Sequence, residues 1–262
     1  ATSKKVNIHT DKGIVEGVFG WPAIHTRKGK DESLSPKLEN IFVDVGAKDK
    51  EEVLAMGIHV GCVITYPDKF GMLNDRYYVG RALDNRMGGF CIAEVARLLK
   101  ENGDKLPYTL YVVNAVQEEI GLRGAEMIAN HIKPDVAIVT DVTHDTNTPL
   151  LNPKKLGDTK AGEGPSLTYA PAVQNNLLKL IIDTAGKNEI PFQRAASSRS
   201  TGTDTDAFAY SGSGVASALI SIPLRYMHTT VEMAHKDDVD NVTKLIYETL
   251  KRIEKNHNFK YF

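Results

Sequence analysis

The sequence predicts an α/β protein in two parts, a small β-rich module followed by a larger domain of alternating strands and helices. Up to residue 77, apolar residues recur at period two in short runs separated by Gly, Pro and Asp, as in strands joined by turns. From residue 78 onward, apolar strands alternate with helical patterns, which is the succession of βαβ units. Those strands are apolar throughout, which is typical of a sheet covered on both faces.

The β-rich module is expected at residues 1–77. Its strand-like segments are KVNIHT, GIVEGVFG, NIFVDVGA and HVGCVITYP, and a short helix is expected at residues 50–56. Asp11, Lys12 and Gly13 lie at the expected bend between the first two strands. Residues 26–37 are polar, charged and poor in apolar side chains, so we expect a surface loop there.

The α/β domain is expected at residues 78–262. Apolar residues at helical spacing predict a helix at residues 87–100, and the apolar run TLYVVNAV predicts the next strand. The later elements are a helix in GLRGAEMIANHI, a strand in DVAIVTD, a loop at 143–169, a helix at 173–187 and a strand at 214–222. The last helix is expected to begin at Asp237 or Asp238, because aspartate is a common N-cap residue.

Charge and cysteine content exclude several classes of partner. The 262 residues carry 32 basic and 33 acidic side chains without a long run of like charge, so neither nucleic acid nor a membrane surface is expected as a partner. A small or peptide-like substrate fits better. Cys62 and Cys91 are far apart in sequence, which predicts reduced thiols rather than a disulfide framework or a thiolate zinc site. We expect a cytoplasmic protein, because no apolar run is long enough for a membrane span and no secretory signal is evident.

Acidic side chains and one histidine follow the predicted strands. Asp84 follows YYVGRAL, Glu118 and Glu119 follow LYVVNAVQ, Asp141 follows VAIVT, and His228 lies a few residues beyond SALISIP. A single acid in such a position would mean little, because Asp and Glu also cap helices and close turns. Ligands bind at the carboxyl edge of open α/β sheets, so the recurrence of these residues on successive strands predicts a site.

This set of carboxylates and an imidazole suits zinc, cobalt or manganese. One carboxylate can bridge two ions about 3.5 to 4 Å apart, and a water that the ions share becomes hydroxide near neutral pH. A carboxylate that binds no metal can accept the proton and pass it to the leaving amine. Glu118 and Glu119 can divide these roles, because consecutive side chains on extended backbone point to opposite sides. The sequence therefore predicts a divalent-metal hydrolase.

The chain resembles the M42 family of metallo-aminopeptidases in a series of blocks that occur in the family's order. The blocks are GRALDNRMG, NAVQEEIGLRGA, VTDVTHD, GEGP, TGTDTDAF and IPLRYMHTTVEM, preceded by IFVDVGAKDKEEVLAMGIHVGCVITY. They cover nearly the whole chain, and their joint occurrence is far more specific than a pair of glutamates. The resemblance implies a three-layer, zinc-peptidase-like catalytic domain with a small β-barrel-like insertion. It also implies a homo-oligomer, from dimer to dodecamer, assembled through the β module.

The resemblance also implies a role for each residue at the predicted strand ends. Asp84 would bridge two divalent metal ions, and Glu118 would be the general base. Glu119 and His228 would complete the ligands of the first metal, and Asp141 would bind the second.

Two further sets of residues lie in the matched blocks. Gly202, Thr203 and Asp204 match a block near the family's substrate cleft, although a Gly-Thr-Asp triplet is also an ordinary helix start. Arg225 and Glu232 flank His228 and could steady it, or could be ordinary surface charges.

One block of the family has no counterpart in this sequence. The family's second metal takes a histidine from an HxD-type motif that precedes the β insertion, so here the second metal would have only Asp84 and Asp141. We therefore expect the β module to be incomplete and the catalytic domain to lack its N-terminal part. His144 and His235 lie nearest to matched blocks, but neither is a strong candidate to replace the missing ligand.

Three functions remain open at this point. The leading one is a two-metal aminopeptidase that removes N-terminal residues from peptides through a hydroxide bridging the metals. An inactive or truncated subunit with an incomplete metal site is the second. The third is a polysaccharide hydrolase, following the endoglucanase label of some family members. It is disfavoured, because a glycosidase uses two carboxylates that flank a sugar.

Overall fold

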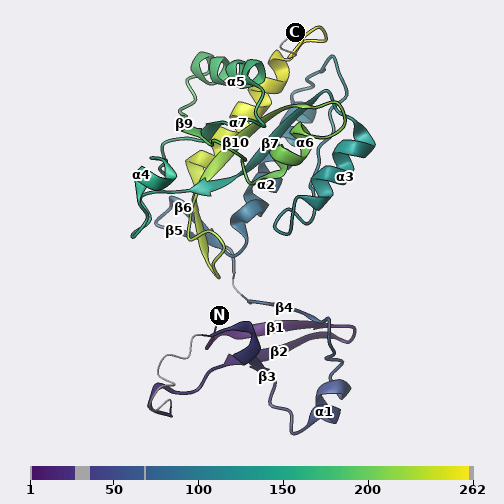
Figure 1. The fold of residues 1–262 in the computed structure, drawn as a ribbon, viewed down its shortest axis with the longest axis vertical. Helices are drawn as coiled ribbons and strands as arrows, with labels where there is room; N and C mark the ends of the chain where they lie inside the picture. The colour runs from purple at the N-terminus through teal and green to yellow at the C-terminus, as the bar shows by residue number, and fades with distance from the viewer. Residues whose placement is uncertain (1, 27–35, 68, 260–262) are drawn as a thin grey trace. The chain divides into compact units, whose positions relative to one another are not determined.

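The computed structural model describes residues 2–26, 36–67 and 69–259 (Figure 1). Most of the predicted loop at 26–37 lies outside these residues. The chain divides into two compact units, Ala1–Lys69 and Phe70–Phe262. The division falls eight residues before the expected one, because β5 (Gly71–Leu73) pairs with β6 (Tyr77–Gly80) in the sheet of the second unit.

The first unit is built on an antiparallel sheet in the order β3-β2-β1-β4. Its elements are β1 (Lys5–Thr10), β2 (Gly13–Gly20), η1 (Ile24–Thr26), η3 (Leu38–Asn40), β3 (Phe42–Asp44), α1 (Lys50–Ala55) and β4 (Val63–Thr65). Asp49 caps α1 by accepting a hydrogen bond from the amide of Glu52. The outer strands β3 and β4 each have one partner among the described residues, so the sheet is open there and does not close into the expected barrel.

The second unit contains a seven-stranded mixed sheet in the order β5-β6-β11-β10-β8-β9, and β7, which lies outside this order, also pairs with β10 along nearly its whole length. Its remaining strands are β7 (Val136–His144), β8 (Ser166–Tyr169), β9 (Gln193–Ala196), β10 (Ala216–Arg225) and β11 (Glu232–His235). β7 and β10 are parallel from the pair Val136–Ala216 to the pair His144–Leu224. This long pairing forms the centre of the unit.

Helices cover this sheet in two groups (Figure 1). The helices are α2 (Leu83–Glu101), α3 (Arg123–Ile132), α4 (Pro153–Leu156), α5 (Asn175–Lys187), α6 (Asp204–Ala209) and α7 (Lys236–Arg252). α7 packs against α2 and α5, while α6 packs on β7 and β10 and also contacts α3. Fully buried side chains such as Ile181, Ile220 and Leu245 form one core between the sheet and the group of α2, α5 and α7. The predicted three-layer α/β fold is confirmed.

Several predicted elements differ from the structure. Residues 109–116 form no strand, because their backbone has no ladder partner within the described ranges, and Tyr111 and Val116 remain 60% and 66% exposed. The predicted loop at 143–169 contains α4 and β8. The last helix begins at Lys236, and the side chain of His235 caps it by accepting a hydrogen bond from the amide of Asp237.

Candidate functional site

Asp84 lies where β6 leads into α2. Ala82, the N-cap residue, has a left-handed conformation with φ 50°, and Asp84 itself has non-helical backbone angles. The next residue ties this turn to the sheet, because the side-chain amide of Asn85 donates a hydrogen bond of 2.7 Å to the carbonyl oxygen of Thr140 in β7. The Asp84 side chain is only 9% exposed, so its position is set by the packing around it.

His228 lies in the turn between β10 and β11, and its side chain is 63% exposed. The turn brings both Tyr226 and His228 into the left-handed region, each with φ 61°. The pairing of Arg225 with Met233 closes the base of the turn. The imidazole therefore projects from a short connection whose ends are held by the sheet.

Glu118 and Glu119 lie in the tight turn that precedes α3. The carbonyl oxygen of Glu118 accepts hydrogen bonds from the amides of Gly121 and Leu122, at 3.0 and 2.9 Å. Gly124 allows the helix to approach the preceding segment, because a Cβ at this position would lie 2.4 Å from the carbonyl oxygen of Val116. The turn is therefore held at both ends although residues 109–116 form no strand.

These three connections bring together Asp84, Glu119 and His228. The Nε2 atom of His228 lies 3.0 Å from Oδ2 of Asp84 and 3.3 Å from Oε2 of Glu119. One donor atom from each residue lies within 4.8 Å of the other two, and this is the group with such geometry in the described part of the chain. We call these three residues the ligand cluster.

The ligand cluster fits a divalent cation. Two carboxylates and an imidazole are ligands that zinc and similar ions accept. Burial, together with repulsion from Glu119 and Glu232, raises the pKa of Asp84 to about 6 against the opposing effect of His228. A bound cation would relieve that repulsion. Metal ligation by these residues is therefore consistent with both the geometry and the charge.

Charges of the ligand cluster contribute to the raised pKa values of the nearby residues Asp141 and Glu118. Asp141 lies within β7 rather than beyond its end as predicted, because the strand continues to His144. Burial raises the pKa of Asp141 to about 8, opposed by its hydrogen bond from the amide of Val142. Burial, together with the charges of Asp204, Glu119 and Asp84, likewise raises the pKa of Glu118 to about 7.

The triplet Gly202, Thr203 and Asp204 forms the start of α6. Thr203 is the N-cap residue, and the carboxylate of Asp206 accepts a hydrogen bond of 3.0 Å from the amide of Gly202. Asp204 begins the helix, and its buried Oδ1 atom has no hydrogen-bond partner among the described residues. Its charge raises the pKa of both Glu118 and Asp141. Asp204 is therefore electrostatically coupled to Glu118 and Asp141.

Two supporting contacts lie beside the ligand cluster. Glu232 is 2% exposed and accepts hydrogen bonds from the backbone amides of Asp84 and His228. Nε of Arg225 lies 2.5 Å from Oδ2 of the fully buried Asp145. The sequence pattern placed Arg225 and Glu232 beside His228 but did not single out Asp145. The position of Asp145 four residues after the strand predicted in DVAIVTD was an available signal.

The two other histidines near matched blocks lie outside the ligand cluster. His235 caps α7 and makes an edge contact with Tyr77 at 5.0 Å between ring centroids, while His144 is exposed at the end of β7.

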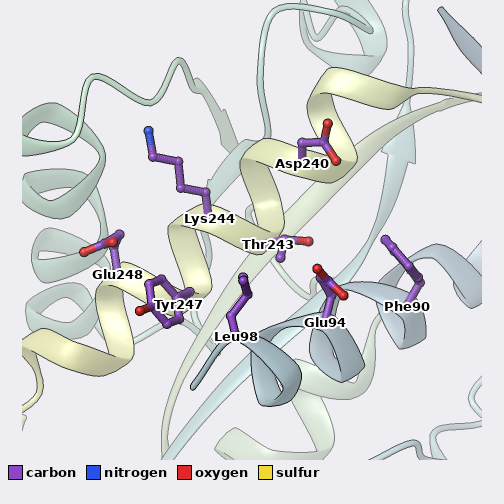
Figure 2. Close-up of a pocket in the computed structure, with 8 residues that line it drawn as sticks. All are labelled: Phe90, Glu94, Leu98, Asp240, Thr243, Lys244, Tyr247 and Glu248. Atoms are coloured by element: carbon purple, nitrogen blue, oxygen red, sulfur yellow. The ribbon is translucent and has the colours of Figure 1, made fainter. Parts of the chain in front are cut away.

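A groove between α2 and α7 contains none of these residues (Figure 2). Phe90, Glu94 and Leu98 line it from α2, and Asp240, Lys244 and Tyr247 line it from α7. No helix in the described ranges has the length and apolarity to span a bilayer.

Comparisons with known proteins identify one family. Residues 1–245 match the family described as M42 glutamyl aminopeptidase. The lysyl aminopeptidase of Pyrococcus furiosus is 36% identical over 96% of this chain and 71% of its own length. The TET aminopeptidase of the marine sediment archaeon Thaumarchaeota archaeon SCGC AB-539-E09 superimposes with a TM-score of 0.89 at 31% identity, covering 97% of this chain and 72% of that one.

A third similar protein is the TET1 peptidase of Pyrococcus horikoshii, which can assemble into a tetrahedron or a large octahedral shell. It has a TM-score of 0.78 at 28% identity, and the match covers 96% of this chain and 73% of that chain.

Proposed function

Because this chain belongs to the M42 family of metal-dependent aminopeptidases, we propose that it removes N-terminal residues from peptides with the help of two divalent metal ions. The observation that carries the proposal is the convergence of Asp84, Glu119 and His228 within 4.8 Å. The three residues come from separate connections of the second unit, so local sequence does not explain their meeting.

Asp84, Glu119 and His228 would hold the first ion, and Asp84 and Asp141 would contact the second. Ions bound there supply Lewis acidity, which polarises the scissile carbonyl and makes water a nucleophile near neutral pH. Asp141 is 6% exposed and its pKa is raised by burial and by neighbouring carboxylates, so it gains most from a nearby positive charge.

Glu118 would act as general base through its side-chain carboxylate. The pKa of Glu118 is raised to about 7. A general base with a pKa near neutral pH can accept a proton and then give it up again. Glu118 lies outside the ligand cluster, whereas its neighbour Glu119 lies within it. This difference supports separate roles for two adjacent glutamates.

Asp204 would attract the free amino group of the peptide, with Gly202 and Thr203 shaping the start of α6. Five carboxylates influence one another here, which gives the site a negative potential that suits a cationic N-terminus. The residues involved are Asp84, Glu118, Glu119, Asp141 and Asp204.

Hydrolysis of amino-acid p-nitroanilides tests this function directly. We expect activity that is lost on chelation, restored by zinc, cobalt or manganese, and greatly reduced in Glu118→Gln. Activity that survives both chelation and the substitution would overturn the proposal.

A subunit with an incomplete metal site is the second candidate, because Asp141 lies outside the ligand cluster and, among the described residues, the second ion is proposed to contact Asp84 and Asp141 alone. Metal analysis separates the two candidates. Two ions per chain support the enzyme, and one or none supports the incomplete subunit. No observation on the described residues favours the polysaccharide alternative.

We also propose a cytoplasmic homo-oligomer, between dimer and dodecamer in size. Cys62 and Cys91 are both free thiols, which suits a reducing compartment. Ile14 and Val63 lie on either side of His9 on one face of the first unit's sheet, and they are 61% and 63% exposed. Contact between copies would cover these side chains, and exposed apolar patches often mark such protein–protein contacts.

A further inference from the structure

We propose that Glu232 is a positioning residue that fixes the backbones of two metal ligands, Asp84 and His228, relative to each other. The inference rests on the proposed function, since it treats both residues as ligands. Glu232 would contact neither the metal nor the substrate. It would act through the two residues that do.

The geometry shows one side chain holding two distant segments. Oε2 of Glu232 accepts a hydrogen bond of 3.1 Å from the amide of Asp84, and Oε1 accepts one of 2.9 Å from the amide of His228. Each oxygen therefore serves a different ligand. The residue is 2% exposed, so water does not compete for these bonds.

Strand pairing places Glu232 between the two segments. It is the first residue of β11, which pairs with β6 on one side and with β10 on the other. Asp84 follows β6 and His228 follows β10. Glu232 lies directly opposite Gly80, at the end of β6 from which the chain turns toward Asp84.

Both amides need an acceptor from a side chain. The amide of Asp84 lies at the start of α2, where the first amides of a helix have no intrahelical partner. The amide of His228 belongs to a left-handed residue in a turn. Both hydrogen bonds are partly buried. An amide left without a partner there is costly, and a carboxylate offers an acceptor oxygen to each of the two.

The charge of Glu232 is otherwise unfavourable in this place. It lies beside Asp84 and repels it, and none of the ion pairs among the described residues includes Glu232. A neutral buried residue would avoid that repulsion. The double hydrogen bond accounts for a carboxylate here, because glutamine would turn a donor toward one of the two amides.

Loss of this contact should loosen the spacing of the ligand atoms, now 3.0 Å between Oδ2 of Asp84 and Nε2 of His228. Groups that orient metal ligands typically change metal affinity by 10- to 100-fold when they are altered. The expected effect is therefore on metal binding itself, in addition to any effect on stability.

Asp238 provides a matched control in the same unit. It is also a fully buried carboxylate that accepts two backbone hydrogen bonds, of 2.7 Å from Gly162 and 2.8 Å from Gly164. It lies outside the ligand cluster. Asp238→Asn therefore reports what the loss of such a buried carboxylate does to the fold alone.

The test is calorimetric titration with Co²⁺ of the full chain freed of metal at pH 7.5, with thermal unfolding measured on the same samples. We expect Glu232→Gln to bind Co²⁺ at least 10-fold more weakly than wild type, and Asp238→Asn to bind within twofold of wild type. Glu232→Asp should resemble Glu232→Gln, because its shorter side chain cannot reach both amides.

Equal Co²⁺ affinity of the Glu232 and Asp238 variants would overturn the inference while leaving the proposed function intact. A wild-type chain that binds no Co²⁺ would overturn both. If neither Glu232 variant folds, hydrogen exchange of the backbone amides in the wild type tests the inference instead. The amides of Asp84 and His228 should be protected in NMR spectra, and rapid exchange of either would overturn the inference.

Discussion

Glu118 and Glu119 are neighbours in sequence with different surroundings. Glu119 lies 3.3 Å from the imidazole of His228, whereas burial and the charge of Asp204 dominate the environment of Glu118. Substituting each glutamate in turn therefore distinguishes metal binding from proton transfer.

We predict that Glu118→Gln lowers kcat by about 10²- to 10⁴-fold, the usual contribution of a general base, and leaves the metal content unchanged. Glu119→Gln should lose metal first and activity as a consequence. Elemental analysis of each variant beside its kcat checks this. Metal loss in Glu118→Gln but not in Glu119→Gln would reverse the assignment.

Asp238 gives a pH-dependent prediction. Its pKa is raised from 3.8 to about 6 by burial, against the two amide hydrogen bonds that lower it. Because the folded state holds the proton more tightly than the unfolded state, this stabilising contribution is full below about pH 4 and is lost as the pH rises through about 6.

The wild type should therefore gain stability relative to Asp238→Asn as the pH falls from 7 to 4, by up to about 3 kcal/mol. Urea unfolding of both proteins at the two pH values measures the difference. A difference that does not change with pH would contradict the raised pKa.

At the scale of elements, the pairing of β7 with β10 depends on more than its ladder. Near the ends of the two strands, Arg225 of β10 binds the buried Asp145 and also lies over the ring of Tyr77, with its guanidinium carbon 5.1 Å from the ring centroid. The connection that carries His228 follows Arg225 directly. The ion pair therefore anchors the base of that connection.

Asp145→Ala should destabilise the protein by about 3 kcal/mol, because it leaves a partly buried guanidinium without its partner. The control is Asp183→Ala, which removes an exposed pair with Lys179 on α5 and should cost less than about 1 kcal/mol. Urea unfolding of both variants provides the comparison, and equal losses would contradict this account.

Most helices and the long strand β7 followed from sequence patterns, whereas the short strands β8, β9 and β11 did not. The long apolar stripes of α2 and α7 and the apolar run of β7 were recognisable, because helical and strand periods are local. β8, β9 and β11 have four residues each, too few for a period to be read. Residues 109–116 have an apolar strand pattern but no partner among the described residues, which shows that pattern alone does not form a ladder.

At the scale of the whole molecule, the two units differ in the size of their cores. Val6 and Ile8 are the buried large apolar side chains of the described part of the first unit, whereas the second unit has a continuous core. All residues of the ligand cluster belong to the second unit. The first unit is therefore expected to serve assembly rather than chemistry.

We predict that Ile14→Asp combined with Val63→Asp shifts the oligomer toward smaller species and leaves Co²⁺ binding within twofold of wild type. Charges on this face would have to be desolvated at an interface. Light scattering measures the mass. Lys105→Asp, an exposed substitution in the second unit, is the control, and an unchanged mass in the double variant would exclude this face from assembly.

By itself, the sequence determined the family and the candidate ligands, because motif blocks and side-chain chemistry are properties of short segments. Only the tertiary structure decided which candidates meet. Asp84, Glu119 and His228 lie far apart along the chain and converge through the pairing of β6, β11 and β10 and the turn before α3. The role of Glu232 is of the same kind, since its two hydrogen bonds exist only when β11 lies between the strands that carry its partners.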